Sequence, residues 1–360
     1  MGSKIIINSS ILHERPTGLG IYVKNVIKEL HKYDENIRVL SPVDIEGIKV
    51  EKINKYVKPS YKKIGGLMRV LWTQLILPFK VKKDEIIYHP FQYISLFSKS
   101  KQIITIHDFI PLYYPEVAKH QNKYYRFLMP ILLKRAYKIV AISENTKQDI
   151  LKFYNIDENK VHVIPNGYDN KLFNVENADI STLKKYNIDY DYMVMVGASY
   201  PHKNLEIAIK AIADIKEECR LIIVGKESEY IRKLKELSKE LNIEEKVNFI
   251  GYIPDEDLPS LYYYSKAFLY TTLYEGFGLP ILEAMGCETV VITSDNSSLP
   301  EVYGDAALVF KDNDLVDLRE KMEDILRSET LRKSIIEKSK KNIKMFSWER
   351  TAREIYNILE

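Results

Sequence analysis

The chain of 360 residues is long enough for two domains, and its 46% hydrophobic and 29% charged residues are typical of a globular protein rather than a disordered one. Two cysteines, Cys219 and Cys287, are too few for a disulfide framework, and no apolar stretch approaches the roughly 18 residues of a membrane span. The net charge of +3 is uneven, because residues 1–170 carry 27 Lys and Arg against 16 Asp and Glu, whereas residues 171–360 carry 26 against 34. These features predict a soluble, cytoplasmic protein whose two halves meet different partners.

Short apolar runs rich in β-branched residues alternate with amphipathic stretches along the whole chain. In the first half they predict strands at 5–7, 86–88, 103–106 and 139–142, with helices at 21–31 and 145–153. In the second half they predict strands at 193–196, 221–224, 247–250, 268–270 and 290–293, with helices at 205–215 and 229–241. The strands are nearly continuous in apolar residues, which indicates parallel sheets covered on both faces.

One stretch of the first half combines basic and apolar residues. Nine Lys and Arg lie between Glu51 and Asp84, interleaved with Tyr, Trp, Leu and Ile. Such a segment is typical of peripheral contact with an anionic membrane, here the inner face of the cell membrane, but a solvated helix face explains it equally well. Its apolar content is too high for a patch that tracks phosphates, so no nucleic-acid partner is expected.

The strand–helix alternation restarts after a hinge-like stretch at 164–167. The fold class is therefore predicted as α/β, with two doubly wound Rossmann-like domains facing a central cleft. We place an N-terminal domain at 1–165 and a C-terminal domain at 166–346. Ligands of such sheets bind beyond the carboxyl ends of the strands, so the loops at those ends are expected to line the site.

The strongest motif is the stretch 275–283, which follows a predicted strand. Gly276 and Gly278 permit a tight turn, and the backbone amides of Phe277, Gly278 and Leu279 then stand at a helix N-terminus, where phosphate binds without special side chains. Glu275 lies on the loop, whereas Glu283 lies one turn into the helix, where it can accept hydrogen bonds from ribose hydroxyls.

This motif, two glutamates eight positions apart around a Gly-Phe-Gly-Leu-Pro core, resembles the signature of the retaining GT-B glycosyltransferases of family 4. The resemblance extends over most of the chain, in the family's order, to residues 17–20, 106–108, 164–169, 197–204, 294–307 and 346–350. It implies that residues from about 347 to 360 form a helix that crosses back to the N-terminal domain. It also implies a nucleotide-sugar donor and a glycan acceptor.

The resemblance assigns roles to residues that follow predicted strands. It implies catalytic roles for Glu275, which contacts the donor sugar, for His107, which contacts a hydroxyl near C6, and for Lys203, whose ammonium stabilises the departing diphosphate. The donor-binding set is Gly18, Gly20, Gly197, Ser199, Lys203, Asn204, Gly276, Phe277, Gly278, Leu279 and Glu283. An arginine common in the family is replaced by Ala198, so a second cation is missing or comes from elsewhere.

Asp108, Tyr113 and Tyr114 are the candidates on the acceptor side, with core packing as the alternative role for the aromatics. The acceptor is predicted to be a glycan or lipid-linked oligosaccharide, and the donor sugar to be a hexose, with mannose ahead of rhamnose and glucose.

Three pairs of aspartates are spaced like metal ligands, at 189/191, 255/257 and 312/314, but they fit loops and helix N-caps better. No metal or other cofactor is expected. A nucleotide-sugar epimerase and a non-catalytic nucleotide-sugar-binding protein remain as alternative functions.

Overall fold

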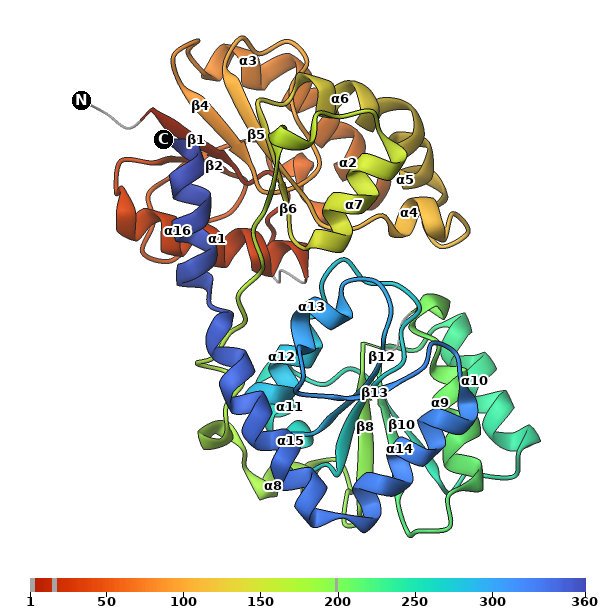
Figure 1. The fold of residues 1–360 in the computed structure, drawn as a ribbon. Coiled ribbons are helices and arrows are strands. Elements are labelled where there is room, and N and C mark those ends of the chain that lie inside the picture. The colour runs from red at the N-terminus through yellow and green to blue at the C-terminus, as the bar shows by residue number, and fades with distance from the viewer. Residues whose placement is uncertain (1–3, 15–17, 198–199) are drawn as a thin grey trace. The chain divides into compact units, whose positions relative to one another are not determined.

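The computed structural model describes residues 4–14, 18–197 and 200–360, and the chain divides into two compact units. The N-terminal unit comprises Met1–Gly167 and Trp348–Glu360, and the C-terminal unit comprises Tyr168–Ser347. These divisions lie close to the boundaries expected at 165/166 and 346/347. Each unit is a parallel sheet with helices on its faces, which confirms the predicted fold class of two Rossmann-like domains (Figure 1).

Among its described residues, the N-terminal unit has a seven-stranded, wholly parallel sheet in the order β3-β2-β1-β4-β5-β6-β7. The strands are β1 Ile5–Asn8, β2 Arg38–Ser41, β3 Val50–Lys52, β4 Ile86–His89, β5 Lys101–Ile106, β6 Lys138–Ala141 and β7 Val161–Val163. The helices are α1 Leu19–Tyr33, α2 Lys62–Leu71, α3 Leu77–Lys80, α4 Ile110–Tyr113, α5 Lys119–Lys123, α6 Met129–Arg135, α7 Glu144–Phe153 and α16 Trp348–Leu359. Two π-helical turns, η3 Trp72–Ile76 and η4 Tyr124–Leu128, continue α2 and α5.

Alternation along β1 shows why its sequence is apolar throughout. Ile5 and Ile7 join the core beneath α1 and α16, whereas Ile6 joins a separate cluster with Trp72 and Leu77 on the opposite face. Because both faces of the strand are covered, every residue of β1 is buried.

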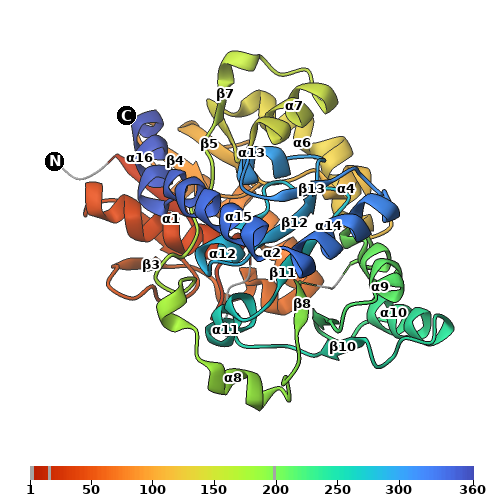
Figure 2. The same cartoon turned by 60° about the horizontal axis from the view of Figure 1, so that its bottom comes forward.

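The last helix, α16, lies beside α1 in the N-terminal unit (Figures 1 and 2). Ile355 and Leu359 of α16 are buried in the same cluster as Val26 and Leu30 of α1, and Tyr33 stacks on Tyr356 with ring centroids 5.5 Å apart. The helix expected at about 347–360 is thus present and belongs to the N-terminal unit.

Among its described residues, the C-terminal unit has a six-stranded parallel sheet in the order β10-β9-β8-β11-β12-β13. The strands are β8 Tyr192–Val196, β9 Arg220–Val224, β10 Val247–Ile250, β11 Ala267–Tyr270, β12 Val291–Ser294 and β13 Leu308–Phe310. The helices are α8 Ile180–Lys185, α9 Leu205–Asp214, α10 Glu229–Glu240, α11 Leu258–Tyr263, α12 Leu279–Gly286, α13 Leu299–Tyr303, α14 Leu315–Arg327 and α15 Glu329–Asn342. The strand order changes direction at the β8/β11 pair, the topological position at which doubly wound sheets bind ligands. Within the described residues, no helix is long and apolar enough to cross a membrane.

Candidate functional site

The loop from β11 to α12 is built around Gly278. This residue is the N-cap of α12 with φ 118°, and a Cβ added to it would lie 3.1 Å from Cδ2 of Leu299. The backbone conformation therefore favours glycine, and a side chain would in addition crowd Leu299. Pro280 lies in the first turn of the helix, where its missing N–H costs no hydrogen bond. The hydroxyl of Ser298 donates to the carbonyl oxygens of Glu275 and Phe277 (3.0 and 2.9 Å), which fixes the loop ahead of the helix.

Lys203 and Glu275 form an ion pair after two neighbouring strands of the C-terminal unit. Lys203 ends a short 3-10 turn after β8, and its Nζ lies 2.5 Å from Oε1 of Glu275, while a second contact of 3.3 Å reaches the hydroxyl of Tyr270. Thr272 also donates to Oε1 of Glu275, at 2.9 Å. An ammonium has three N–H donors, and the contacts with Glu275 and Tyr270 use two of them, so within the described part of the chain one is left for a further anion. The structure thus brings together two of the three predicted catalytic residues.

The surroundings of Glu275 keep its carboxylate charged. Burial raises its pKa, but the Lys203 ammonium and the hydrogen bonds from Lys203 and Thr272 outweigh burial, so the pKa of Glu275 lies below its ordinary value. An ionised carboxylate beside an ammonium can orient sugar hydroxyls and can stabilise positive charge that develops on a sugar ring.

Glu283, one turn into α12, has the opposite electrostatic setting. Burial, followed by the repulsion of Asp255 and Asp169, raises its pKa to about 8, and the hydroxyl of Tyr262 lies 3.4 Å from its Oε2. The side chain is nevertheless partly accessible. Glu283 is therefore protonated at neutral pH in the ligand-free chain and can both donate and accept hydrogen bonds.

The turn after β8 contains three more residues of the predicted donor set. Gly197 has φ 82°, and a Cβ at this position would meet open space, so the backbone here can be approached closely by a ligand. Asn204 is the left-handed N-cap of α9, and its amide donates to Asn313 (3.2 Å). Ser199 lies outside the described residues.

On the N-terminal unit, the glycine loop and α1 differ from the expected arrangement. We predicted a helix beginning near Ile21, but α1 begins at Leu19, with Gly18 as its N-cap at φ 40°. Gly20 consequently lies inside the first turn instead of preceding the helix. Its amide is still among the N-terminal N–H groups that the helix itself leaves without partners.

His107 directly follows β5. Its Nε2 lies 2.9 Å from the carbonyl oxygen of Pro90, which can only accept, so Nε2 carries the proton and Nδ1 is the ring acceptor. Burial lowers the pKa of His107 to about 4, and the ring of Tyr22 packs edge-on against it at 4.6 Å. A neutral imidazole held in one tautomer is suited to accept a hydrogen bond from a hydroxyl.

The candidates on the acceptor side mostly make hydrogen bonds within the N-terminal unit. Asp108 accepts from the amide of Ile110 at the start of α4. The hydroxyl of Tyr113 donates to Asp149 (2.6 Å) and accepts from Lys152 (3.0 Å), while Tyr114 ends α4. These contacts give Asp108 and Tyr113 structural roles, and their binding of an acceptor stays a prediction.

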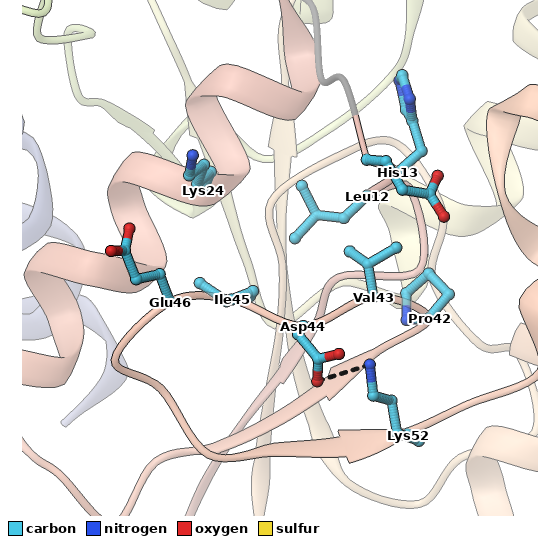
Figure 3. A pocket seen from close by; sticks show the side chains of 10 residues that line it. Leu12, His13, Lys24, Pro42, Val43, Asp44, Ile45, Glu46 and Lys52 are labelled. Atoms are coloured by element: carbon cyan, nitrogen blue, oxygen red, sulfur yellow. Dashed lines mark ion pairs between the residues drawn. The ribbon is translucent and has the colours of Figure 1, made fainter.

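A hollow of about 480 Å³ lies where β1, β2 and β3 end in the N-terminal unit (Figure 3). Residues 12–14, residues 42–46, Lys24 of α1 and Lys52 line it, and Lys52 forms an ion pair of 2.8 Å with Asp44. Sequence patterns did not indicate this hollow, because its charged side chains are scattered over four segments. Carboxylates and ammonium groups together are suited to the hydroxyls of a polar ligand.

The aspartate pairs do not converge on a metal centre. Across residues 4–14, 18–197 and 200–360, no group of three or more His, Cys, Asp or Glu side chains has the arrangement of metal ligands. Asp314 caps α14 as expected, by accepting from the amides of Val316 and Asp317. The expected cap at Asp257 is wrong, because its carboxylate binds Lys185 and Tyr186 at 2.5 Å instead of the first turn of α11.

Two profiles of known protein families match the chain. The profile described as Glycosyl transferases group 1 matches residues 180–342, and the profile described as Glycosyltransferase Family 4 matches residues 16–172. Together the two profiles account for most of the chain. The chain belongs to glycosyltransferase family 4.

Curated members of the family are similar to large parts of the chain. The O-antigen chain mannosyltransferase RfbU of Salmonella typhimurium is 35% identical over 59% of this chain, and the match spans 57% of that protein. The O-antigen chain mannosyltransferase B of Escherichia coli is 29% identical over 75% of this chain and 73% of its own length. Among solved structures, Anabaena HepE in complex with UDP and glucose has a TM-score of 0.74 at 18% identity, covering 99% of this chain and 98% of that one.

Several polar side chains that surround the motif at residues 275–283 were not predicted from the sequence. The backbone amide of Glu275 donates to the hydroxyl of Ser297 (3.0 Å), and the side-chain amide of Asn296 donates to the carbonyl oxygen of Thr272 (2.9 Å). Together with Thr272 and Ser298, these side chains position the carboxylate of Glu275. Their only sequence signal is that they follow β11 and β12, whose carboxyl ends are adjacent in the sheet.

Proposed function

We propose that the chain transfers a hexose from a nucleotide-diphosphate sugar to a glycan acceptor, with retention of configuration, in surface polysaccharide biosynthesis. The observation that carries this proposal is the Lys203–Glu275 pair beside the N-terminus of α12. It combines a cation for the leaving diphosphate with a carboxylate for the sugar. The mannosyltransferase names of the two O-antigen relatives favour mannose over rhamnose or glucose.

In the proposed reaction, the bond between C1 and the diphosphate oxygen breaks while a bond from the acceptor hydroxyl oxygen to C1 forms on the same face. The acceptor proton passes to the departing phosphate oxygen. The third donor of Lys203 and the amides at the start of α12 would stabilise the charge on the leaving group. Glu275 would stabilise the cationic sugar ring, Glu283 would bind the ribose, and neutral His107 would accept from a sugar hydroxyl. No metal is required, because backbone amides and an ammonium supply the positive charge.

The acceptor is proposed to bind the N-terminal unit and to be lipid-linked, so that the enzyme would work in the cytoplasm at the inner membrane face. The hollow at the ends of β1–β3 offers Lys24 and Asp44 for sugar hydroxyls. An Asp44→Asn substitution would then raise KM for the acceptor while leaving donor binding unchanged. An unchanged KM would remove this hollow from the proposal.

The first test is thermal stabilisation by GDP-mannose, UDP-glucose, UDP-GlcNAc and dTDP-rhamnose, with EDTA present throughout. A ligand at 100-fold excess over its Kd stabilises the native state by about 2.7 kcal/mol. A shift with GDP-mannose that Lys203→Ala abolishes would support the proposal, and a transfer assay with the same donor would separate catalysis from binding alone. The absence of any shift from a folded sample would overturn it and would favour a different ligand. An epimerase would instead interconvert the donor without an acceptor.

A further inference from the structure

The helical segment of residues 62–80 carries apolar side chains on its exposed face as well as on its buried face, where Trp72 and Leu77 pack in the core. Ile64, Leu67, Leu71, Leu75 and Phe79 are all exposed, and Phe79 is 90% exposed. The spacing of three to four residues places them along one stripe of the helix. Arg69, by contrast, is only 5% exposed and donates to the carbonyl oxygen of Val57 through Nε and Nη2. A helix face in contact with water alone would carry the opposite pattern.

A second helical segment, residues 119–135, repeats this design. Phe127 is 73% exposed and Ile131 is exposed four residues later. In both segments a π-helical turn ends two residues before a proline, at Pro78 and Pro130. The ring of proline clashes with the preceding turn and removes a helical hydrogen bond, which a wider turn accommodates. The extra residue of the π turn changes which side chains face outward.

Residues 92–98 join the two segments into one surface. The side-chain amide of Gln74 donates to the carbonyl oxygen of Ile94 (2.8 Å) and accepts from the amide of Leu96 (2.8 Å). On the other side, Arg135 donates to the carbonyl oxygen of Ser98 (2.6 Å). Phe97, which is 66% exposed, belongs to this connecting stretch and lines one hollow with Leu75 and Phe79.

Basic side chains border this apolar surface. A hollow of about 470 Å³ is lined by Leu75, Phe79 and Phe97, with Lys83 and Lys99 among its other lining residues. A neighbouring hollow of about 340 Å³ shares Lys99, and its other lining residues include Lys101, Lys134, Arg135 and Lys160. Residues 97–135 carry seven Lys and Arg against two acids, so positive charge predominates.

We propose that this surface, defined by Leu75, Phe79, Phe97, Phe127 and Ile131 with Lys83, Lys99 and Lys134 around them, docks onto an anionic lipid bilayer. Aromatic and aliphatic side chains would enter the boundary between headgroups and acyl chains, and the lysines would contact lipid phosphates. A second copy of the chain is a poorer occupant, because two faces with the same basic border repel each other. The inference extends the proposed function, in which the acceptor is lipid-linked, but docking itself requires no sugar transfer.

The test is co-sedimentation of the full chain with vesicles of phosphatidylcholine alone or of phosphatidylcholine with 30% phosphatidylglycerol, a mole fraction on the order of that in anionic membranes. We expect binding to the anionic vesicles, weakened at least about tenfold by Phe79→Ser with Phe97→Ser. Each of Lys83→Gln and Lys99→Gln should weaken binding about fivefold. The matched controls are Ile180→Ser with Val316→Ser, which are exposed apolar residues of the C-terminal unit, and Lys184→Gln.

Controls that weaken binding as much as the surface variants, or a wild-type chain that stays in the supernatant, would overturn the proposal. A Phe79→Trp variant adds an independent readout, since its fluorescence should be quenched by brominated acyl chains whereas that of Val316→Trp should not. If the Phe79/Phe97 variant instead converts a dimer into a monomer and binds vesicles normally, the surface is an interface between copies and the proposal fails. Stabilisation by the donor is measured on every variant, so a failure of docking is distinguishable from a failure of the transferase assignment.

Discussion

The α12 helix and the helical segment of residues 62–80 are both rich in apolar side chains, but α12 buries most of them, whereas the segment exposes an apolar stripe in addition to its buried Trp72 and Leu77. In α12, Ile281, Leu282 and Met285 are buried, and the one acid among them, Glu283, has its pKa raised to about 8. In the segment 62–80 the apolar stripe is exposed, and burial lowers the pKa of the enclosed Arg69.

The two regions differ in what their apolar side chains can contact. The C-terminal unit buries the apolar side chains of α12, so the carboxyl groups of Glu275 and Glu283 lie in surroundings where electrostatic interactions are stronger than in water. The N-terminal unit leaves apolar side chains outside, where a contact with another apolar phase can cover them.

The largest effect is expected for Glu275→Gln. Removing the charge that faces the developing cation should lower the rate of sugar transfer by about 10²–10³-fold. Donor binding, measured by thermal stabilisation, should persist, because Lys203 and the helix N-terminus remain. Initial rates with the preferred donor test this, with Glu236→Gln on the exposed face of α10 as the matched control. Full activity in Glu275→Gln would contradict the role of this carboxylate.

Gly278→Ala should have the next largest effect. A residue with a Cβ at φ 118° is strained, and the added atom meets Leu299 at 3.1 Å, so we expect a loss of about 2–3 kcal/mol in the free energy of unfolding. Gly66, in α2, is the matched control, since a Cβ there meets nothing within 4 Å. Gly66→Ala should stabilise the chain by about 0.5–1 kcal/mol. Urea unfolding of both variants gives the comparison, and equal effects would show that the α12 turn tolerates a side chain.

Glu283→Gln should change how stability depends on pH. The pKa of Glu283 rises from 4.5 to about 8 on folding, so the folded chain binds more protons than the unfolded chain between these values. Stability from this group is therefore present below pH 4.5 and is lost as the pH rises through 8. The glutamine variant cannot ionise and should be more stable than wild type by about 1–3 kcal/mol above pH 8. Parallel unfolding curves for the two proteins from pH 5 to 9 would contradict the raised pKa.

Much of the fold and part of the candidate site followed from local patterns. All nine predicted strands are present, because long apolar runs between turns have few alternatives in a buried parallel sheet. The missed strands, β2, β3, β7 and β13, have three or four residues each and lie toward sheet edges, where local sequence constrains structure least. The pairing of Lys203 with Glu275 could not be predicted, since it joins residues 72 positions apart through adjacent strands.

The basic segment shows most clearly what a sequence leaves open. Its pattern suited membrane contact and a helix packed on its own domain equally, because periodicity identifies an apolar stripe without telling which way it faces. The buried Arg69 and the exposed Phe79 show that the apolar stripe faces away from the core. Docking onto a bilayer stays a proposal. The free energy of unfolding of single variants tests, independently of docking, whether the apolar stripe faces solvent or the core.

The smallest effects are therefore expected from Ile64→Ser and Leu67→Ser. Both side chains are at least 60% exposed, so removing them takes little apolar area out of the folded core, and each should change the free energy of unfolding by no more than about 0.5 kcal/mol. Ile209→Ser in α9 is the matched control, because that side chain is fully buried and its loss should cost about 3 kcal/mol or more. A cost at Ile64 or Leu67 close to that at Ile209 would mean that the stripe is packed against the protein in solution. A negligible loss in the free energy of unfolding would mean that neither residue contributes to the fold. Contact with something other than this chain would then be the physical reason for apolar side chains at these positions.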